Sequence, residues 1–385
     1  MIMNNFFNLI FNRSKIFIYI NYFLAFLTSL IFLVSAKILE LYNIDKYILI
    51  ISIATIISSI IYSTGIKSKI INETIIIGLS KKTGVSIMVF LILTNLYLAT
   101  KGFSLNFFFL IHILFEISYN LISIYFIKNE NTKYHSIFLF LNSLLKLSFL
   151  FFLSLTYENL LTILLIYYSI FLIIFLFYFK YLNIKFEFNT ESFNFFDLIF
   201  VLTGSLIFQL DKIIGENTLT SDDLFIYFFI FKLSSIFQIL GSILTQPTRN
   251  KVLKNGTIDE LTKKEIKFFT LIILLALIFV NSIVFVIQSY FPDNIKLIFN
   301  FNNILIFNLW SLSFIFHIFN GFYIDGMFIK GYSKKIIFYN LLIIVLQLIT
   351  MTTFSQLSLW VLSILIGQIV LSIYSYFYYI SYANS

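Results

Sequence analysis

Long apolar stretches separated by short polar segments run along the whole chain. A helix rises about 1.5 Å per residue, so about 20 apolar residues cross a hydrocarbon core about 30 Å thick. The pattern therefore predicts an all-α integral membrane protein with twelve transmembrane helices and no soluble domain. The predicted helices cover residues 17–36, 47–66, 83–101, 104–127, 136–155, 158–179, 194–213, 223–246, 268–290, 300–323, 336–354 and 358–381.

The positions of lysine and arginine give this pattern an orientation, because cytoplasmic loops are enriched in both. With the N-terminus in the cytoplasm, 19 of the 26 Lys and Arg residues fall on the cytoplasmic side and five on the opposite side. The other two, Lys146 and Lys232, fall inside predicted helices. We therefore expect both termini in the cytoplasm. The first helix is long and is followed by others, so we expect no cleaved signal peptide.

Composition agrees with lipid as the main solvent of the chain. Of its 385 residues, 60% are hydrophobic and 11% are charged, and the mean hydropathy is +0.96. A soluble domain carries about 25% charged residues. The formal charge of +8 comes largely from the loops. We expect those loops to meet anionic lipid headgroups rather than nucleic acid.

Several kinds of chemistry have no motif in the sequence. The chain has no cysteine, and its three histidines are far apart, so we expect no metal site and no cofactor. There is no phosphate-binding loop for ATP, no Gly-x-Ser-x-Gly elbow and no His-Glu-x-x-His motif. The predicted outer loops are short. These observations favour a transporter over an enzyme.

A weak internal repeat divides the chain into two parts. Leu27–Phe32 resembles Leu202–Phe208, and Lys37–Glu40 resembles Lys212–Glu216, in both cases 175 residues further along. Six predicted helices separate the copies, so both halves have the same orientation. Such duplications are common in transporters. The repeat predicts two six-helix bundles related by a parallel pseudo-twofold axis, with a cavity between them. The predicted domains are residues 1–181 and 182–385.

Ionisable residues inside predicted helices are candidate functional residues, because each costs about 2.5–3.5 kcal/mol at the bilayer centre. Glu116 and Lys146 lie near the middle of adjacent predicted helices. They either form an ion pair or belong to a site, in which Lys146 binds substrate together with Asn142 and Glu116 couples transport to an ion. His112 lies one helical turn from Glu116, which is a weak signal for a metal.

The second half contains Lys232 near the middle of a predicted helix, with Ser234, Ser235 and Gln238 close by. Lys232 either snorkels or pairs with Asp211, or it lies in a wet cavity and binds an anionic ligand together with Gln238. Asp211 is the second candidate for ion coupling. Asp211 and Lys212 either pair at the membrane interface, or Asp211 reaches the cavity.

Two further groups of polar residues are expected to be structural. His317, Asn320 and Asp325 lie along the inner end of the predicted helix 300–323 and its loop, and they are typical of interfacial caps. The basic run from Arg249 to Lys267 is expected to form a cytoplasmic loop that fixes the topology.

Two segments of the sequence carry a family resemblance. The first has an amphipathic start, Asn21 early in the first helix and the run Gly65–Glu73 after the second. The second has Asp211–Gly215, an acidic turn, Ile226-Tyr227, Lys232-Leu233 and Pro247 in that order. In both segments the chain resembles the O-antigen and capsule flippases of the multidrug/oligosaccharidyl-lipid/polysaccharide exporter superfamily.

This resemblance implies a fold and a function. The two bundles would form a V around a central cationic cavity and move by alternating access. The substrate would be an undecaprenyl-diphosphate-linked oligosaccharide, flipped across the cytoplasmic (inner) membrane for surface polysaccharide synthesis. Coupling to ions or protons would use Glu116 or Asp211. A polysaccharide polymerase and a chain-length regulator would be partners, alongside membrane lipids.

Three alternatives remain open at this point. A multidrug exporter of the same superfamily would favour buried carboxylates, whereas the charges inside the predicted helices here are mostly lysine. A polysaccharide polymerase, which is an enzyme, would carry arginines on a long outer loop, but the two arginines, Arg13 and Arg249, are both assigned to the cytoplasmic side. A structural membrane protein is the third alternative.

Overall fold

The described part of the chain covers all but one of the predicted helices. The computed structural model describes residues 13–60, 67–71, 74–80, 107–128, 132–181, 185–189, 195–255, 260–290, 300–329 and 333–383, with single positions 89, 92, 94 and 96. The predicted helix at 83–101 therefore lies almost entirely outside the described residues.

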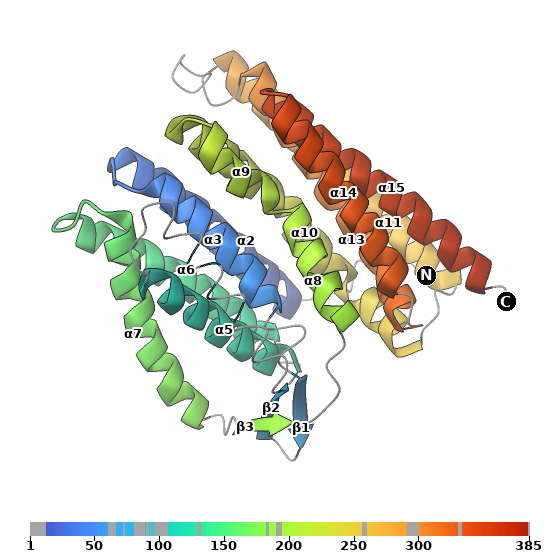
Figure 1. The fold of residues 1–385 in the computed structure, drawn as a ribbon, viewed down its shortest axis with the longest axis horizontal. Coiled ribbons are helices and arrows are strands. Elements are labelled where there is room, and N and C mark those ends of the chain that lie inside the picture. The colour runs from blue at the N-terminus through green and yellow to red at the C-terminus, as the bar shows by residue number, and fades with distance from the viewer. Residues whose placement is uncertain are drawn as a thin grey trace. The chain divides into compact units, whose positions relative to one another are not determined.

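Eleven of the twelve predicted helices have described counterparts, and one of the eleven is divided into two helices, α8 and α9. Their bounds are α2 Arg13–Ile38, α3 Ile44–Ile60, α5 Phe107–Lys128, α6 Thr132–Ser154, α7 Leu160–Tyr181, α8 Phe195–Ile207, α9 Leu210–Thr218, α10 Ser221–Asn255, α11 Glu260–Tyr290, α13 Phe301–Ile329, α14 Ser333–Thr353 and α15 Leu357–Ala383 (Figure 1). Seven helices in the described residues are long and apolar enough to cross a membrane. The predicted class, a multi-pass helical membrane protein, is confirmed.

Two features of this list differ from the sequence prediction. The seventh predicted helix, 194–213, is interrupted, because α8 ends at Ile207 and α9 begins at Leu210. Helix α10 continues to Asn255, so it covers part of the basic run that was expected to be a loop.

A small sheet joins two of the segments between helices, and the sequence analysis does not anticipate it. Strands β1 (Lys67–Ile71) and β2 (Thr74–Ser80) pair antiparallel, and β2 pairs in parallel with β3 (Lys185–Asn189). The isoleucines at 70, 71, 75, 76 and 77 favour strands because β-branched side chains fit a pleated surface. Segments that follow α3 and α7 are thereby held together.

The described helices fall into two compact units, Met1–Leu202 and Thr203–Ser385. The boundary between these two ranges falls within the sequence of α8. The same neighbour relations occur in each unit. In the first, α5 packs against α3, α6 and α7, and α6 packs against α7. In the second, α13 packs against α10, α14 and α15, and α14 packs against α15. These four pairs correspond helix by helix under the predicted repeat.

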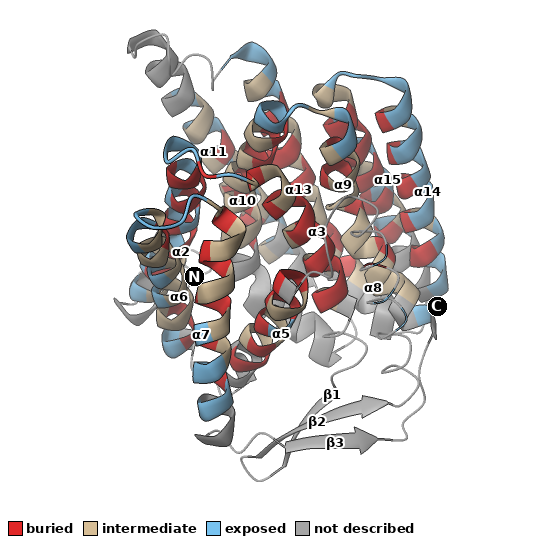
Figure 2. Ribbon diagram, turned by 60° about the vertical axis from the view of Figure 1, so that its left-hand side comes forward, coloured by how far each residue is buried: buried red, intermediate tan, exposed pale blue. Residues whose placement is uncertain are grey.

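Each unit exposes many large apolar side chains, and its largely apolar interior also holds buried polar residues. On α14, Leu342, Val345 and Ile349 are exposed, whereas Asn340 and Gln347 are buried. Figure 2 shows exposed and buried positions on opposite sides of this helix. Lipid offers nothing for an amide to bond to, so polar side chains turn toward other helices.

The contact between α14 and α15 depends on a glycine. A Cβ atom added at Gly367 of α15 would lie 2.6, 2.8 and 3.2 Å from the Cγ2, Cγ1 and Cβ atoms of Ile343 on α14. Ile343 is branched at Cβ, so a rotation about its Cα–Cβ bond does not remove the contact. At Gly204 of α8, by contrast, nothing lies within 4 Å of an added Cβ.

We expect Gly367→Ala to lower the free energy of unfolding by about 1–3 kcal/mol, because the added methyl forces α14 and α15 apart. Denaturation of the purified protein in detergent by SDS measures this. Gly204→Ala is the matched control and should cause no loss, since alanine favours helix. Equal stability of the two variants would contradict the proposed close approach.

Candidate functional site

The interruption between α8 and α9 lies beside the most deeply buried charges in the described part of the second unit. Phe208 and Gln209 form a tight turn, in which their amides donate to the carbonyls of Ser205 and Leu206 at 3.3 and 3.0 Å. The Lys212 amide then donates to Gln209, 3.2 Å away, rather than to Phe208 as a continuous α-helix requires.

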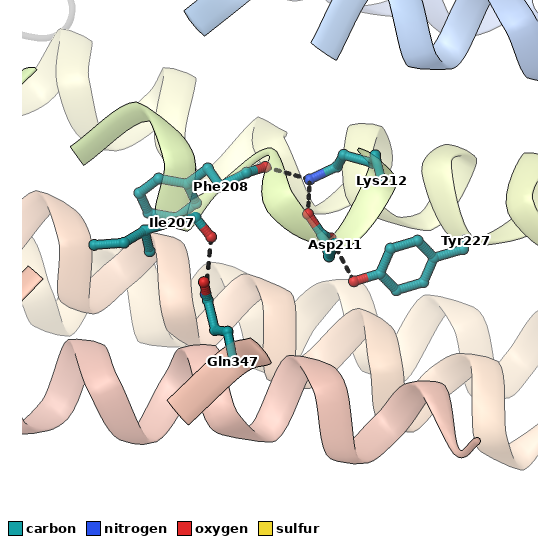
Figure 3. A network of polar contacts seen from close by, with 6 residues as sticks. All are labelled: Ile207, Phe208, Asp211, Lys212, Tyr227 and Gln347. Carbon is teal, nitrogen blue, oxygen red and sulfur yellow. Dashed lines mark hydrogen bonds and ion pairs between the residues drawn. The ribbon is translucent and has the colours of Figure 1, made fainter. Parts of the chain in front are cut away.

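Side chains satisfy the carbonyl groups that the turn releases. The Lys212 Nζ donates to the Phe208 carbonyl, which its own amide would bind in an unbroken helix. Gln347 of α14 donates its Nε2 to the Ile207 carbonyl at 2.9 Å (Figure 3). An unpaired carbonyl in hydrocarbon costs several kcal/mol, so these two side chains stabilise the turn.

Asp211 balances the charge of Lys212. The Lys212 Nζ lies 3.0 Å from Asp211 Oδ1, and both side chains are 0% exposed. The other carboxylate oxygen, Oδ2, accepts a hydrogen bond of 2.5 Å from the Tyr227 hydroxyl of α10 (Figure 3). The pairing expected between Asp211 and Lys212 is present, but inside the unit rather than at its surface. Asp211 therefore pairs with Lys212, not with Lys232.

Two aromatic rings complete the surroundings of the Lys212 ammonium group. Its Nζ lies 3.4 Å from the ring centroid of Phe231 on α10 and 4.7 Å from that of Trp310 on α13. The electron-rich ring faces attract a cation, and more strongly when water is excluded. The ammonium group thus has a carboxylate, a carbonyl and two ring faces around it.

In the first unit, Lys146 of α6 lies half-buried among aromatic side chains. Its Nζ donates to the Tyr47 hydroxyl of α3 at 2.9 Å. The ring centroids of Phe32, Tyr47 and Tyr168 lie 4.5, 5.3 and 5.7 Å from it. Within the described residues its hydrogen bond goes to Tyr47. All of these partners are neutral side chains.

Other candidates of the first unit lie close to this lysine. Asn142 is one helical turn before Lys146 on α6 and accepts a hydrogen bond of 2.6 Å from Tyr167 through its Oδ1. Glu116 is half-buried on α5 and acts electrostatically on Tyr167 and Tyr168. The first unit therefore brings Lys146, Asn142 and Glu116 into one region.

His112 belongs to the same region but has an unusual environment. It is 1% exposed, and its ring stacks on Phe108 and lies 4.7 Å from the centroid of Tyr168. Within the described residues neither ring nitrogen has a hydrogen-bond partner. No group of three or more metal-binding side chains occurs among those residues.

Lys232 and Gln238 are half-buried on α10. The Lys232 Nζ lies 5.4 Å from the ring centroid of Phe228, one turn earlier on the same helix. Lys232 also acts electrostatically on Lys212. Lys232 therefore lies close enough to the buried Asp211–Lys212 pair to interact with it.

Sequence reasoning missed several partners and misplaced one residue. Tyr47, Tyr227 and Gln347 have no motif, and only their polar atoms within apolar helices signal them. Asn320, expected as an interfacial cap, is fully buried and donates 2.9 Å to Gln368 Oε1 of α15. It also accepts a hydrogen bond from Ser372. This cluster connects α13 to α15.

Comparisons with known proteins add little to this geometry. No protein-family model matches the chain, and no curated protein matches it. A solved structure titled "Crystal structure of MATE in complex with MaL6" is similar over 97% of this chain and 90% of that chain, at 11% identity and a TM-score of 0.43. A likeness of this size carries no argument about function.

We expect Asp211→Asn to lower the free energy of unfolding by about 3–5 kcal/mol, because it leaves the Lys212 charge buried without its counter-charge. The double variant Asp211→Asn/Lys212→Met removes both charges and should be more stable than Asp211→Asn alone. SDS titration of the two variants, of Lys212→Met and of the wild type completes the double-mutant cycle. Additive losses would show that the two charges are not coupled.

Proposed function

We propose that this protein is a membrane transporter that flips an undecaprenyl-diphosphate-linked oligosaccharide across the cytoplasmic membrane. The observation that carries the proposal is that each unit holds a half-buried lysine inside its apolar helices, Lys146 in one and Lys232 in the other. Intramembrane lysines usually line a substrate path. An anionic substrate would use both.

The chemistry of a lipid-linked diphosphate matches these side chains. A diphosphate needs positive charge, and the lysine ammonium is a point charge that binds phosphate oxygens. The ring faces and hydroxyl around Lys146 hold its ammonium in place without neutralising it. Oriented positive groups favour a multiply charged anion over a neutral lipid.

Amide side chains near both lysines suit the sugar part of the substrate. The Oδ1 of Asn142 is occupied by the Tyr167 hydroxyl, which leaves its amide nitrogen as a donor for a ligand. Gln238 lies on the same helix as Lys232 and is also half-buried. Sugar hydroxyl groups both donate and accept hydrogen bonds, as amides do.

The repeated arrangement of the two units supports alternating access. Bundles built on the same four helix pairs can move as rigid bodies in alternating access. Glu116 is the better candidate for ion or proton coupling, because Asp211 already balances Lys212. We also propose that both termini lie in the cytoplasm. A polysaccharide polymerase and a chain-length regulator would then act on the flipped product.

We expect Lys232→Ala to reduce flipping about 10- to 100-fold, because a hydrogen bond to a charged group contributes about 1.5–3 kcal/mol and each 1.4 kcal/mol is tenfold. The measurement is transfer of a polyprenyl-diphosphate oligosaccharide between leaflets of reconstituted vesicles. Lys232→Arg keeps the charge and should retain more activity.

Lys37→Ala is the matched control, since Lys37 is exposed at the end of α2, and it should flip at the wild-type rate. Wild-type flipping by Lys232→Ala would contradict the role of this lysine. Vesicles that accumulate a cationic dye but never transfer the lipid-linked sugar would indicate the alternative function, a multidrug exporter.

A further inference from the structure

The groups around the Lys212 ammonium are those that bind a metal cation. They are the Asp211 carboxylate, the Phe208 carbonyl released by the turn, and the ring faces of Phe231 and Trp310. Carbonyls of interrupted helices coordinate cations in membrane transporters. A lysine side chain reaches back from the following helix into this arrangement.

Five oxygen acceptors lie at this turn and one of them lacks a donor, which is a second feature typical of a cation site. The Ile207 and Phe208 carbonyls, both Asp211 oxygens and the Gln347 Oε1 atom are acceptors. The Gln347 Oε1 atom is buried and has no hydrogen-bond partner within the described residues. The donors are Lys212, Tyr227 and the Gln347 amide nitrogen. With the lysine removed, the acceptors would lack a positive charge.

The charge balance selects a monovalent cation. Asp211 supplies one negative charge, which neutralises one positive charge. A divalent ion would leave a net charge in a site that is closed to water, and this is costly inside a membrane.

We propose that the turn between α8 and α9 is a seat for a monovalent cation, which Lys212 fills with its own ammonium group. The seat accepts Na⁺ or K⁺ when this side chain is removed. Lys212 thus acts as a tethered cation, and the wild-type protein needs no free ion at this place. The inference goes beyond the proposed transport function and does not depend on it.

The test measures the melting temperature of purified Lys212→Ala in detergent while KCl or NaCl replaces choline chloride at constant ionic strength. The variant should gain about 5 °C, the rise expected for a ligand present at about 100 times its dissociation constant. The wild type should show no such response. Because no transport is measured, failure here is distinguishable from failure of the flippase proposal.

Two variants define the specificity of the response. Asp211→Asn/Lys212→Ala lacks the carboxylate and should lose the response to K⁺ and Na⁺. Lys37→Ala, at the repeat-related position, should melt at the same temperature in every salt. A melting temperature of Lys212→Ala that is equal in choline, sodium and potassium chloride would overturn the proposal.

A second measurement applies if Lys212→Ala is purified only as aggregate when choline is the sole salt. In that case the yield of monodisperse protein replaces the melting temperature. The proposal predicts that KCl or NaCl during extraction restores monodisperse protein and that choline chloride does not. Aggregation in all three salts would overturn it equally.

Discussion

The absence of water inside a membrane is the constraint on which this structure depends. Every backbone carbonyl and every charge between the helices needs a partner within the protein. The turn at Phe208 and Gln209 separates α8 from α9, and Lys212 and Gln347 stabilise it by binding the two released carbonyls. Lys212 is tolerated in turn because Asp211 and two rings surround it. The released carbonyls and the buried lysine charge thus depend on other polar groups of the same unit.

The same constraint explains how the helices recognise one another. Apolar side chains face lipid on many helices and distinguish no partner. Selective contacts come from polar pairs instead, such as Asn281 with Asn308 between α11 and α13, at 2.7 and 3.0 Å. At Gly367, α14 and α15 approach so closely that no larger side chain fits without a shift. A few small or polar positions therefore determine the packing of each unit.

The sequence predicted the helices well, because hydropathy reports directly on lipid as the solvent. It failed where tertiary contacts override the local pattern. The residues from 194 to 213 are apolar enough for one helix, and nothing local reveals that Gln347, far along the chain, stabilises a break. The sequence repeat equates Lys37 with Lys212, yet α2 is continuous and Lys37 is exposed. The candidate residues are polar side chains inside apolar segments, which the sequence alone reveals. Their partners Tyr47, Tyr227 and Gln347 are recognisable only in three dimensions.

The adjacency of Asp211 and Lys212 in the chain has a consequence for biogenesis. Most buried ion pairs join distant segments, so each charge must enter the membrane alone and wait for its partner. Here the two opposite charges leave the ribosome one after the other and can neutralise each other within a single turn of α9. The insertion machinery therefore handles a nearly neutral dipeptide before α10 and α13 have been synthesised. The hydroxyl of Tyr227 and the rings of Phe231 and Trp310 join later and hold a pair that already exists.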